Sequence, residues 1–131
     1  MKILGIGVDI VENSRLAKSL KNNLFITRIF SNSEILKAKR MKNKKSYYAK
    51  RFAAKEAFVK SIGIGFRNNL NFKDISIVND KVGKPSFIIN EKIKMIVKKQ
   101  FKTSSFNFFL SISDEKKYSI AYVILQKNEN K

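Results

Sequence analysis

Alternating apolar and polar positions predict strands at both ends of the chain. Residues 2–12 divide into two faces: one carries Leu4, Ile6, Val8 and Ile10, and the other carries Ile3, Gly5, Gly7, Asp9 and Val11. Residues 106–112 and 118–125 predict a hairpin, with Phe106, Phe108, Leu110 and Ile112 on one face of its first strand. Shorter stretches at 73–79 and 86–89 predict two more strands.

Capping residues mark the start of two short helices after the first strand. Asn13 can cap a helix over about 14–21, because an Asn side chain accepts a hydrogen bond from the first turn. Ser31 and Glu34 have the spacing of a capping box, so a second helix is expected from there to about residue 42.

Two longer helices follow. The clearer one spans about 46–62 and ends at Gly63, because Gly favours the position after a helix. Asn90 can cap a basic amphipathic helix that runs to about residue 101. This order of elements, with strands at both ends, indicates an α+β fold. A chain of 131 residues has the length of one domain, so we expect a single domain over 1–131.

The charge balance is strongly basic, and two residue types are missing. Lys and Arg number 28 against 10 Asp and Glu, a net charge of +18, which attracts polyanions and acidic proteins. Because the chain has no His and no Cys, a Ser-His-Asp triad, a thiolate nucleophile and a zinc site of the usual ligands are excluded. Chemistry is left to carboxylates, lysines, hydroxyls, backbone amides or a hard cation bound by oxygen.

The hydropathy pattern predicts neither secretion nor a membrane span. Asp9 and Glu12 interrupt the apolar start, and no small-residue cleavage site follows. No apolar run approaches the roughly 18 residues of a membrane span. We therefore expect a soluble, cytoplasmic protein.

Asp9 is the first candidate for chemistry. Its strand face also carries Gly5 and Gly7, so a ligand or another backbone can approach there. A carboxylate in an otherwise apolar strand is costly to bury unless it is paired or bound to a metal. The alternative is an exposed strand end at which Asp9 caps the next element.

Glu56 is the second candidate, on the helix over 46–62. It shares a largely apolar stripe with Ala49, Phe52, Ala53 and Lys60, so an acid and a base could bind a metal and a phosphate side by side. The alternative is an ordinary surface pair with Lys60. The opposite side carries Tyr47, Ala54 and Phe58, so this helix is apolar nearly all round, which indicates deep burial or a subunit interface.

Glycines and basic residues supply weaker candidates. Gly63 and Gly65 after the helix can expose backbone amides to a phosphate, although a helix end alone explains Gly63. Lys84 and Pro85 follow Gly83 and are turn residues that could lie beside such a site. Residues 37–51 contain basic residues and no acid, with Tyr47, Tyr48 and Phe52 nearby as possible stacking partners for bases. The basic helix ending near 101 could dock on the sheet or lie on a membrane surface.

Two segments together resemble the paired signatures of the holo-acyl-carrier-protein synthases, which are small single-module 4′-phosphopantetheinyl transferases. The segments are GIGVDIVE at 5–12, followed by Arg15, and FAAKEAFVKSIGIG at 52–65. Their order and separation fit the family, and NFKDISI at 71–77, GKP at 83–85 and LSIS with YSIAYVIL within 110–125 extend the likeness over nearly the whole chain. The resemblance implies the family's fold, an antiparallel sheet packed against a long central helix, and its usual homotrimer with active sites between subunits.

The resemblance also implies a reaction and its residues. The family moves the 4′-phosphopantetheine group of coenzyme A to a serine of apo acyl carrier protein for fatty acid synthesis, releasing adenosine 3′,5′-bisphosphate. Mg²⁺ there bridges the coenzyme A pyrophosphate to two acids, which correspond to Asp9 and Glu56. The phosphate- and nucleotide-binding positions correspond to Lys60, Gly63, Gly65, Lys84 and Pro85, and the carrier-docking positions to Arg15, Phe25 and Arg28.

The sequence departs from the family at two positions. A His commonly follows the S-I-[ST] of the penultimate strand, but Asp114 stands here. This side chain could point into the phosphate site, or to solvent beside Lys116 and Lys117. Ile64 replaces the usual small polar residue between the two glycines.

Two other functions compete with the transferase. A basic RNA- or ribosome-binding module would explain the charge but not the segments around Asp9 and Glu56. A non-catalytic, carrier-binding relative is prompted by Asp114. The transferase accounts for the +18 as well, because coenzyme A is anionic and acyl carrier proteins are acidic.

Overall fold

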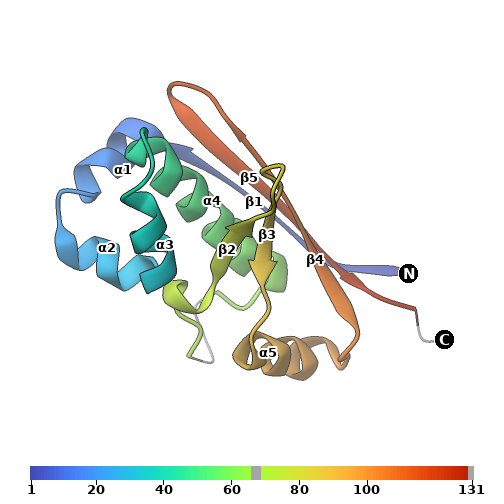
Figure 1. Cartoon of the computed structure of the whole chain (residues 1–131). Helices are drawn as coiled ribbons and strands as arrows, with labels where there is room; N and C mark the ends of the chain where they lie inside the picture. The colour runs from blue at the N-terminus through green and yellow to red at the C-terminus, as the bar shows by residue number, and fades with distance from the viewer. Residues whose placement is uncertain (66–68, 130–131) are drawn as a thin grey trace.

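The computed structural model describes residues 1–65 and 69–129, and Figure 1 shows their arrangement. In chain order the elements are β1 (Lys2–Glu12), α1 (Asn13–Ser19), α2 (Asn23–Ile29), α3 (Asn32–Ala38), α4 (Lys44–Ile62), the 3₁₀ turn η1 (Phe72–Asp74), β2 (Ser76–Asn79), β3 (Pro85–Ile88), α5 (Glu91–Phe101), β4 (Phe106–Asp114) and β5 (Tyr118–Lys127).

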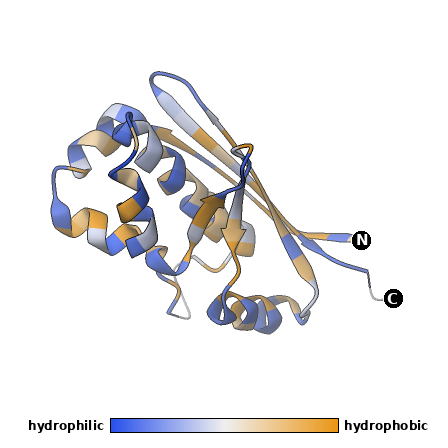
Figure 2. Ribbon diagram, in the orientation of Figure 1, coloured by the Kyte–Doolittle hydropathy of each residue, from blue (hydrophilic) through white to orange (hydrophobic). Residues whose placement is uncertain are grey.

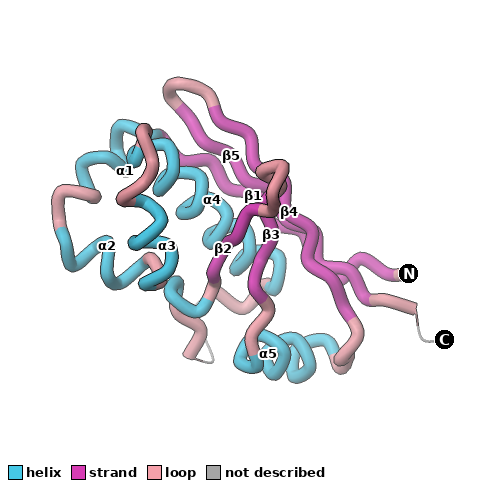
Figure 3. Tube along the Cα trace, viewed as in Figure 1, coloured by secondary structure: helices cyan, strands magenta, loops and turns pink. Residues whose placement is uncertain are grey.

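A three-stranded antiparallel sheet joins the two ends of the chain. Its strand order is β1-β5-β4, and β2 pairs with β3 in a separate antiparallel ribbon. Helix α4 lies along one face of the larger sheet, between it and helices α1 to α3 (Figures 1 and 3). The expected α+β fold, with an antiparallel sheet packed against a long helix, is therefore confirmed.

Helix α4 is buried on most of its circumference within this one chain. Tyr47, Ala54 and Phe58, on the side opposite Glu56, are all less than 5% exposed. Deep burial therefore explains the apolar character of this helix, and a subunit interface is not needed for it. The helix begins with Asn43, whose side chain accepts from Ser46 N, and ends at Gly63 in the left-handed conformation, as the sequence predicted.

Gly5 and Gly7 bring the backbone of β1 against the backbone of α4. A Cβ on Gly5 would overlap the carbonyl oxygen of Ser61, and one on Gly7 would overlap that of Ala57. The sequence allowed either a ligand or another backbone to approach the strand here, and the structure shows the backbone of α4. The contact places Asp9, two residues further on the same face, opposite the next turn of α4.

Asn13 plays a different role from the one expected. It lies inside α1 rather than capping it, and it is 3% exposed. Its amide nitrogen donates to the carbonyl oxygens of Glu115 and Lys116, and its oxygen accepts from Ser119 Oγ. A local capping rule could not anticipate this, because the partners come from the hairpin a hundred residues away.

One further helix and two boundaries differ from the sequence prediction. Helix α2 was not expected, because its β-branched and aromatic residues have modest helix propensity. The capping box of Ser31 and Glu34 is present, but α3 ends at Ala38 rather than near 42. The strand expected over 73–79 begins only at Ser76, after η1.

Helix α5 docks on the core through one apolar stripe. Ile93, Ile96 and Val97 are buried, while the alternating blue bands in Figure 2 mark its lysine-rich outer face. Across the described part of the chain, no helix has both the length and the apolar character that a membrane crossing requires.

Replacing Gly7 by Ala should strongly destabilise the fold. The new methyl group would meet only backbone atoms, including Ser61 N at 2.8 Å, so β1 and α4 must separate. We expect a loss of about 3 kcal/mol or more, at the upper end of overpacking effects. Gly83→Ala is the control: a Cβ there meets open space, so only its positive φ costs energy, about 1–2 kcal/mol. Urea unfolding measures both, and equal losses would contradict the close-packing argument.

Candidate active site

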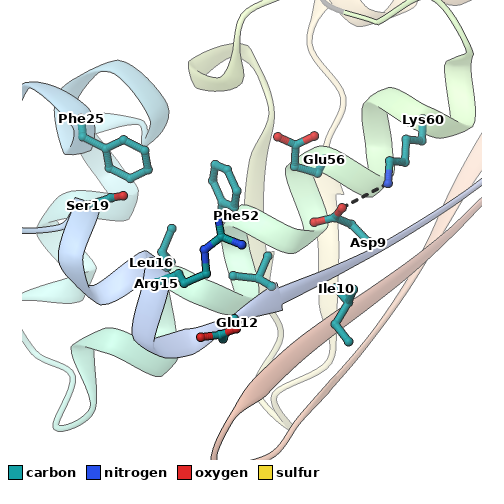
Figure 4. Close-up of a pocket in the computed structure, with 11 residues that line it drawn as sticks. Asp9, Ile10, Glu12, Arg15, Leu16, Ser19, Phe25, Phe52, Glu56 and Lys60 are labelled. Atoms are coloured by element: carbon teal, nitrogen blue, oxygen red, sulfur yellow. Dashed lines mark hydrogen bonds and ion pairs between the residues drawn. The ribbon is translucent and has the colours of Figure 1, made fainter.

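A cleft of about 430 Å³ opens where β1, α1, α2 and α4 meet. Figure 4 shows the residues that line it: Asp9, Ile10, Val11, Glu12, Arg15, Leu16, Ser19, Phe25, Phe52, Glu56 and Lys60. Five of the residues predicted from the sequence therefore share one cavity. It is charged at the Asp9 end and aromatic at the Phe25 end.

Asp9 and Lys60 form an ion pair across β1 and α4. Lys60 Nζ lies 3.1 Å from Asp9 Oδ1 and also donates to the carbonyl oxygen of Val8 at 3.0 Å. The Asp9 side chain is only 17% exposed, and its residue pairs with Ala121 of the central strand β5. Asp9 therefore does not cap an exposed strand end, and Lys60 pairs with it rather than with Glu56.

Glu56 faces the same charged end of the cleft from α4. Burial raises the pKa of this carboxyl, the neighbouring Asp9 carboxylate raises it further, and Lys60 lowers it. The two acids are thus close enough to repel each other, which favours either a shared proton or a bound cation.

The other end of the cleft is walled by aromatic and basic side chains. Arg15 reaches in from α1, beside Phe52 (Figure 4). The Phe52 ring lies between two others, with centroids 6.1 Å from Phe25 and 5.6 Å from Phe72. Such a wall suits an apolar segment of a partner with an acidic group at its edge.

Five predicted positions lie outside this cleft. Arg28, in the last turn of α2, lines a separate hollow with Asn71, Lys73 and Asp74. Lys84 and Pro85 belong to the β2–β3 turn, which Asp80 holds by accepting from Lys84 N at 2.9 Å. Gly83 of this turn borders a second, basic cleft with Lys50 and Arg51. Gly65, like Gly63, is exposed with a positive φ.

Asp114 lies at the end of β4, exposed and outside the Asp9 cleft. Its Oδ2 accepts a hydrogen bond from Ser46 Oγ at 3.0 Å, in the first turn of α4. The residue is therefore at the surface, as one alternative held, but it links the hairpin to α4 instead of standing free beside Lys116 and Lys117.

Comparisons with known proteins identify the family of this chain. The model of the 4′-phosphopantetheinyl transferase superfamily matches residues 5–123. A holo-[acyl-carrier-protein] synthase of Pelagibacter ubique (strain HTCC1062) is 76% identical over 127 residues, covering 97% of this chain and 99% of that protein. The chain belongs to the 4′-phosphopantetheinyl transferase superfamily. Within it, the chain is one of the holo-acyl-carrier-protein synthases, and it is an enzyme.

Solved structures of this family share the fold. The crystal structure of the synthase from Neisseria meningitidis has a TM-score of 0.87 and 36% identity, covering 96% of this chain and all of that one. The synthase from Bacillus anthracis, in complex with CoA (3′,5′-ADP), has a TM-score of 0.79 and 35% identity, covering 96% and 98%. Family membership does not favour the RNA- or ribosome-binding alternative.

Sequence reasoning missed several residues of this cleft. Ser19 and Leu16 line it from α1, and Glu12 lines it from the end of β1. The spacing of Arg15 and Ser19, four residues apart, places both on one helix face and could have identified Ser19. Glu12 had no such signal, because it lies on the opposite face of the strand from Asp9.

Glu56→Gln should stabilise the protein at neutral pH. A pKa raised in the folded state means that the folded protein holds this proton more tightly than the unfolded chain. Stability therefore falls as pH rises from the unfolded pKa to the folded pKa, and the loss is complete above both. Gln removes that loss, so the variant should exceed the parent at pH 7 and match it below pH ~4.

The measurement is the free energy of unfolding against pH for the parent, Glu56→Gln and Glu12→Gln. Glu12 is exposed and bonds only Ser14 among its described neighbours, so its variant should show no such gain. If Glu56→Gln is less stable than the parent at pH 7, the ionised Glu56 carboxylate does not destabilise the folded protein.

Proposed function

We propose that this chain carries out its family's reaction in the Asp9–Glu56 cleft: it moves 4′-phosphopantetheine from coenzyme A to a serine of apo acyl carrier protein. One observation supports this site: the carboxylates of Asp9 and Glu56 and the ammonium of Lys60 line the same cleft from the facing elements β1 and α4. The synthase from Bacillus anthracis in complex with CoA (3′,5′-ADP) supports the substrate. The product would supply fatty acid synthesis in the cytoplasm.

The donor set of the cleft fits Mg²⁺. Asp9 and Glu56 offer carboxylate oxygens only, and their mutual repulsion is relieved by a shared cation. Among the described residues no cluster of three or more acids or other ligands exists. This suits a cation that is held by two carboxylates and completed by substrate phosphates. When bound, Mg²⁺ supplies charge neutralisation at the pyrophosphate.

Glu56 and Lys60, at the charged end of the cleft, have separate roles in the transfer. The serine hydroxyl oxygen of the carrier forms a bond to the phosphorus that bears the pantetheine arm, and the bond to adenosine 3′,5′-bisphosphate breaks. Glu56 lines the cleft at this end and accepts the hydroxyl proton. Lys60, more than half exposed, binds the pyrophosphate oxygens beside Asp9.

The aromatic end of the cleft receives the carrier protein. Arg15 pairs with an acidic group of the carrier, and Phe25 packs against an apolar segment. Arg28 lies on the same helix as Phe25 but in the neighbouring hollow, so it extends the docking surface beyond the cleft. The net charge of +18 speeds the encounter with an acidic partner.

The assembly is a homotrimer with active sites between subunits. Gly63, Gly65, Lys84 and Pro85 bind the phosphates and the nucleotide, yet the turn of Lys84 borders a different cleft of the same chain. A neighbouring subunit that brings its own turn to the Asp9 cleft reconciles the two locations. The face of the sheet turned away from α4 is apolar and exposed, with Ile6, Val8, Ile10, Ile120 and Tyr122 each at least 40% accessible.

Removing either acid should abolish transfer. We expect Asp9→Asn and Glu56→Gln each to lower kcat/KM by about 100-fold or more, because each removes a charge at the pyrophosphate. The assay incubates the protein with apo carrier, coenzyme A and Mg²⁺ and detects the added phosphopantetheine by mass. Chelating Mg²⁺ should stop the parent equally. Near-parental turnover of either variant would refute the site.

A lysine on the outer sheet face should break the trimer. Val8→Lys places a charge in the proposed interface, where desolvation is costly, so the mass by light scattering should fall from three chains to one and most transfer should be lost. Val78→Lys is the matched control, because Val78 is 42% exposed on β2, outside that face. A trimeric, active Val8→Lys variant would overturn this interface.

A further inference from the structure

Lys55, the residue before Glu56, carries a charge at the centre of the molecule. Its side chain is fully buried, and its ammonium donates to Glu34 Oε1 at 2.7 Å and to the carbonyl oxygens of Phe72 and Ile75. An ammonium has three N–H donors, so all of them are used. Neither the metal nor the reacting groups proposed above require this residue.

Glu34 completes the cluster from α3. Its side chain is 2% exposed, and its two oxygens also accept from the backbone nitrogens of Ser31 and Ile77. The pair thus joins the catalytic helix to the start of α3 and to the segment 72–77. A buried ion pair adds little net stability compared with an apolar pair of similar volume, although the loss of one partner is costly.

The segment held by Lys55 supports the aromatic end of the cleft. The carbonyl of Phe72 is bound by Lys55, while its ring is stacked on Phe52 with an interplanar angle of 21°. Phe52 in turn contacts Phe25, and both rings line the cleft. A continuous line of contacts therefore runs from the buried ammonium to the wall against which the carrier protein is proposed to pack.

We propose that Lys55 is a positioning residue for carrier-protein recognition, acting through Phe72 on the Phe52–Phe25 wall. The inference rests on the proposed function of this cleft. Lys55 does not touch the charged end, where Asp9 and Lys60 bind each other. The loss of Lys55 should therefore weaken binding of the carrier protein far more than binding of coenzyme A.

The test compares Lys55→Met with Lys45→Met. Both lie on α4, but Lys45 is exposed in its first turn and outside the cleft. In Lys55→Met we expect the KM for apo carrier protein to rise about tenfold, with kcat and the KM for coenzyme A within about twofold of the parent. Lys45→Met should retain all three constants. A purely structural role would instead lower the active fraction, reducing kcat with both KM values unchanged, and that result overturns the proposal.

A second variant guards against a failure to fold. Phe72→Leu leaves Lys55 in place but removes the ring behind Phe52, so it should raise the same KM, and combining it with Lys55→Met should add little further. If Lys55→Met does not fold, an unchanged carrier KM in Phe72→Leu overturns the proposal and a raised one supports it.

Direct binding separates this inference from the proposed function. Fluorescence anisotropy of labelled apo carrier protein should show about tenfold weaker binding to Lys55→Met than to the parent. A parent that binds the carrier but transfers nothing refutes the proposed reaction, while the binding difference would still support Lys55. A parent that binds no carrier refutes both, and equal binding by parent and variant refutes the role of Lys55 alone.

Discussion

The contact between the backbones of β1 and α4 is the constraint on which the rest of the structure depends. Glycines at 5 and 7 allow the strand to lie directly on the helix, where any side chain would strike the carbonyl oxygens of Ser61 or Ala57. This close approach brings Asp9 within ion-pair distance of Lys60 and next to Glu56. A strand held at the usual side-chain separation would leave these groups apart, so the glycines determine the site as well as the packing.

The cleft combines two environments that suit two kinds of partner. At one end, two half-buried carboxylates repel each other and a partly exposed lysine balances them, which favours a ligand made of phosphates and a cation. At the other, aromatic rings and an arginine form the wall that we propose receives the carrier protein. Helix α4 contributes to both ends through Glu56 and Phe52, so it fixes the charged end relative to the aromatic end.

Buried charge has a separate structural use in this protein. Lys55 and Glu34 bind backbone groups at the start of α3 and in the segment 72–77. Their network ties α3 and that segment to α4. The exposed lysines elsewhere contribute to the net charge and to long-range attraction. The buried Lys55 and the exposed lysines therefore have different roles.

Local signals in the sequence, namely alternation, capping residues and two paired motifs, were enough to predict the α+β fold, the family, the hairpin, the end of α4 and the limits of α5. The folded arrangement was needed to show that Asn13 binds the hairpin, that residues 23–29 form a helix, and that Lys60 pairs with Asp9 rather than Glu56. It also separated Arg28 and the Lys84 turn from the cleft. Except for α2, which begins at its local cap Asn22, these outcomes depend on groups distant in the chain, whose approach is set by packing and not by the neighbouring residues.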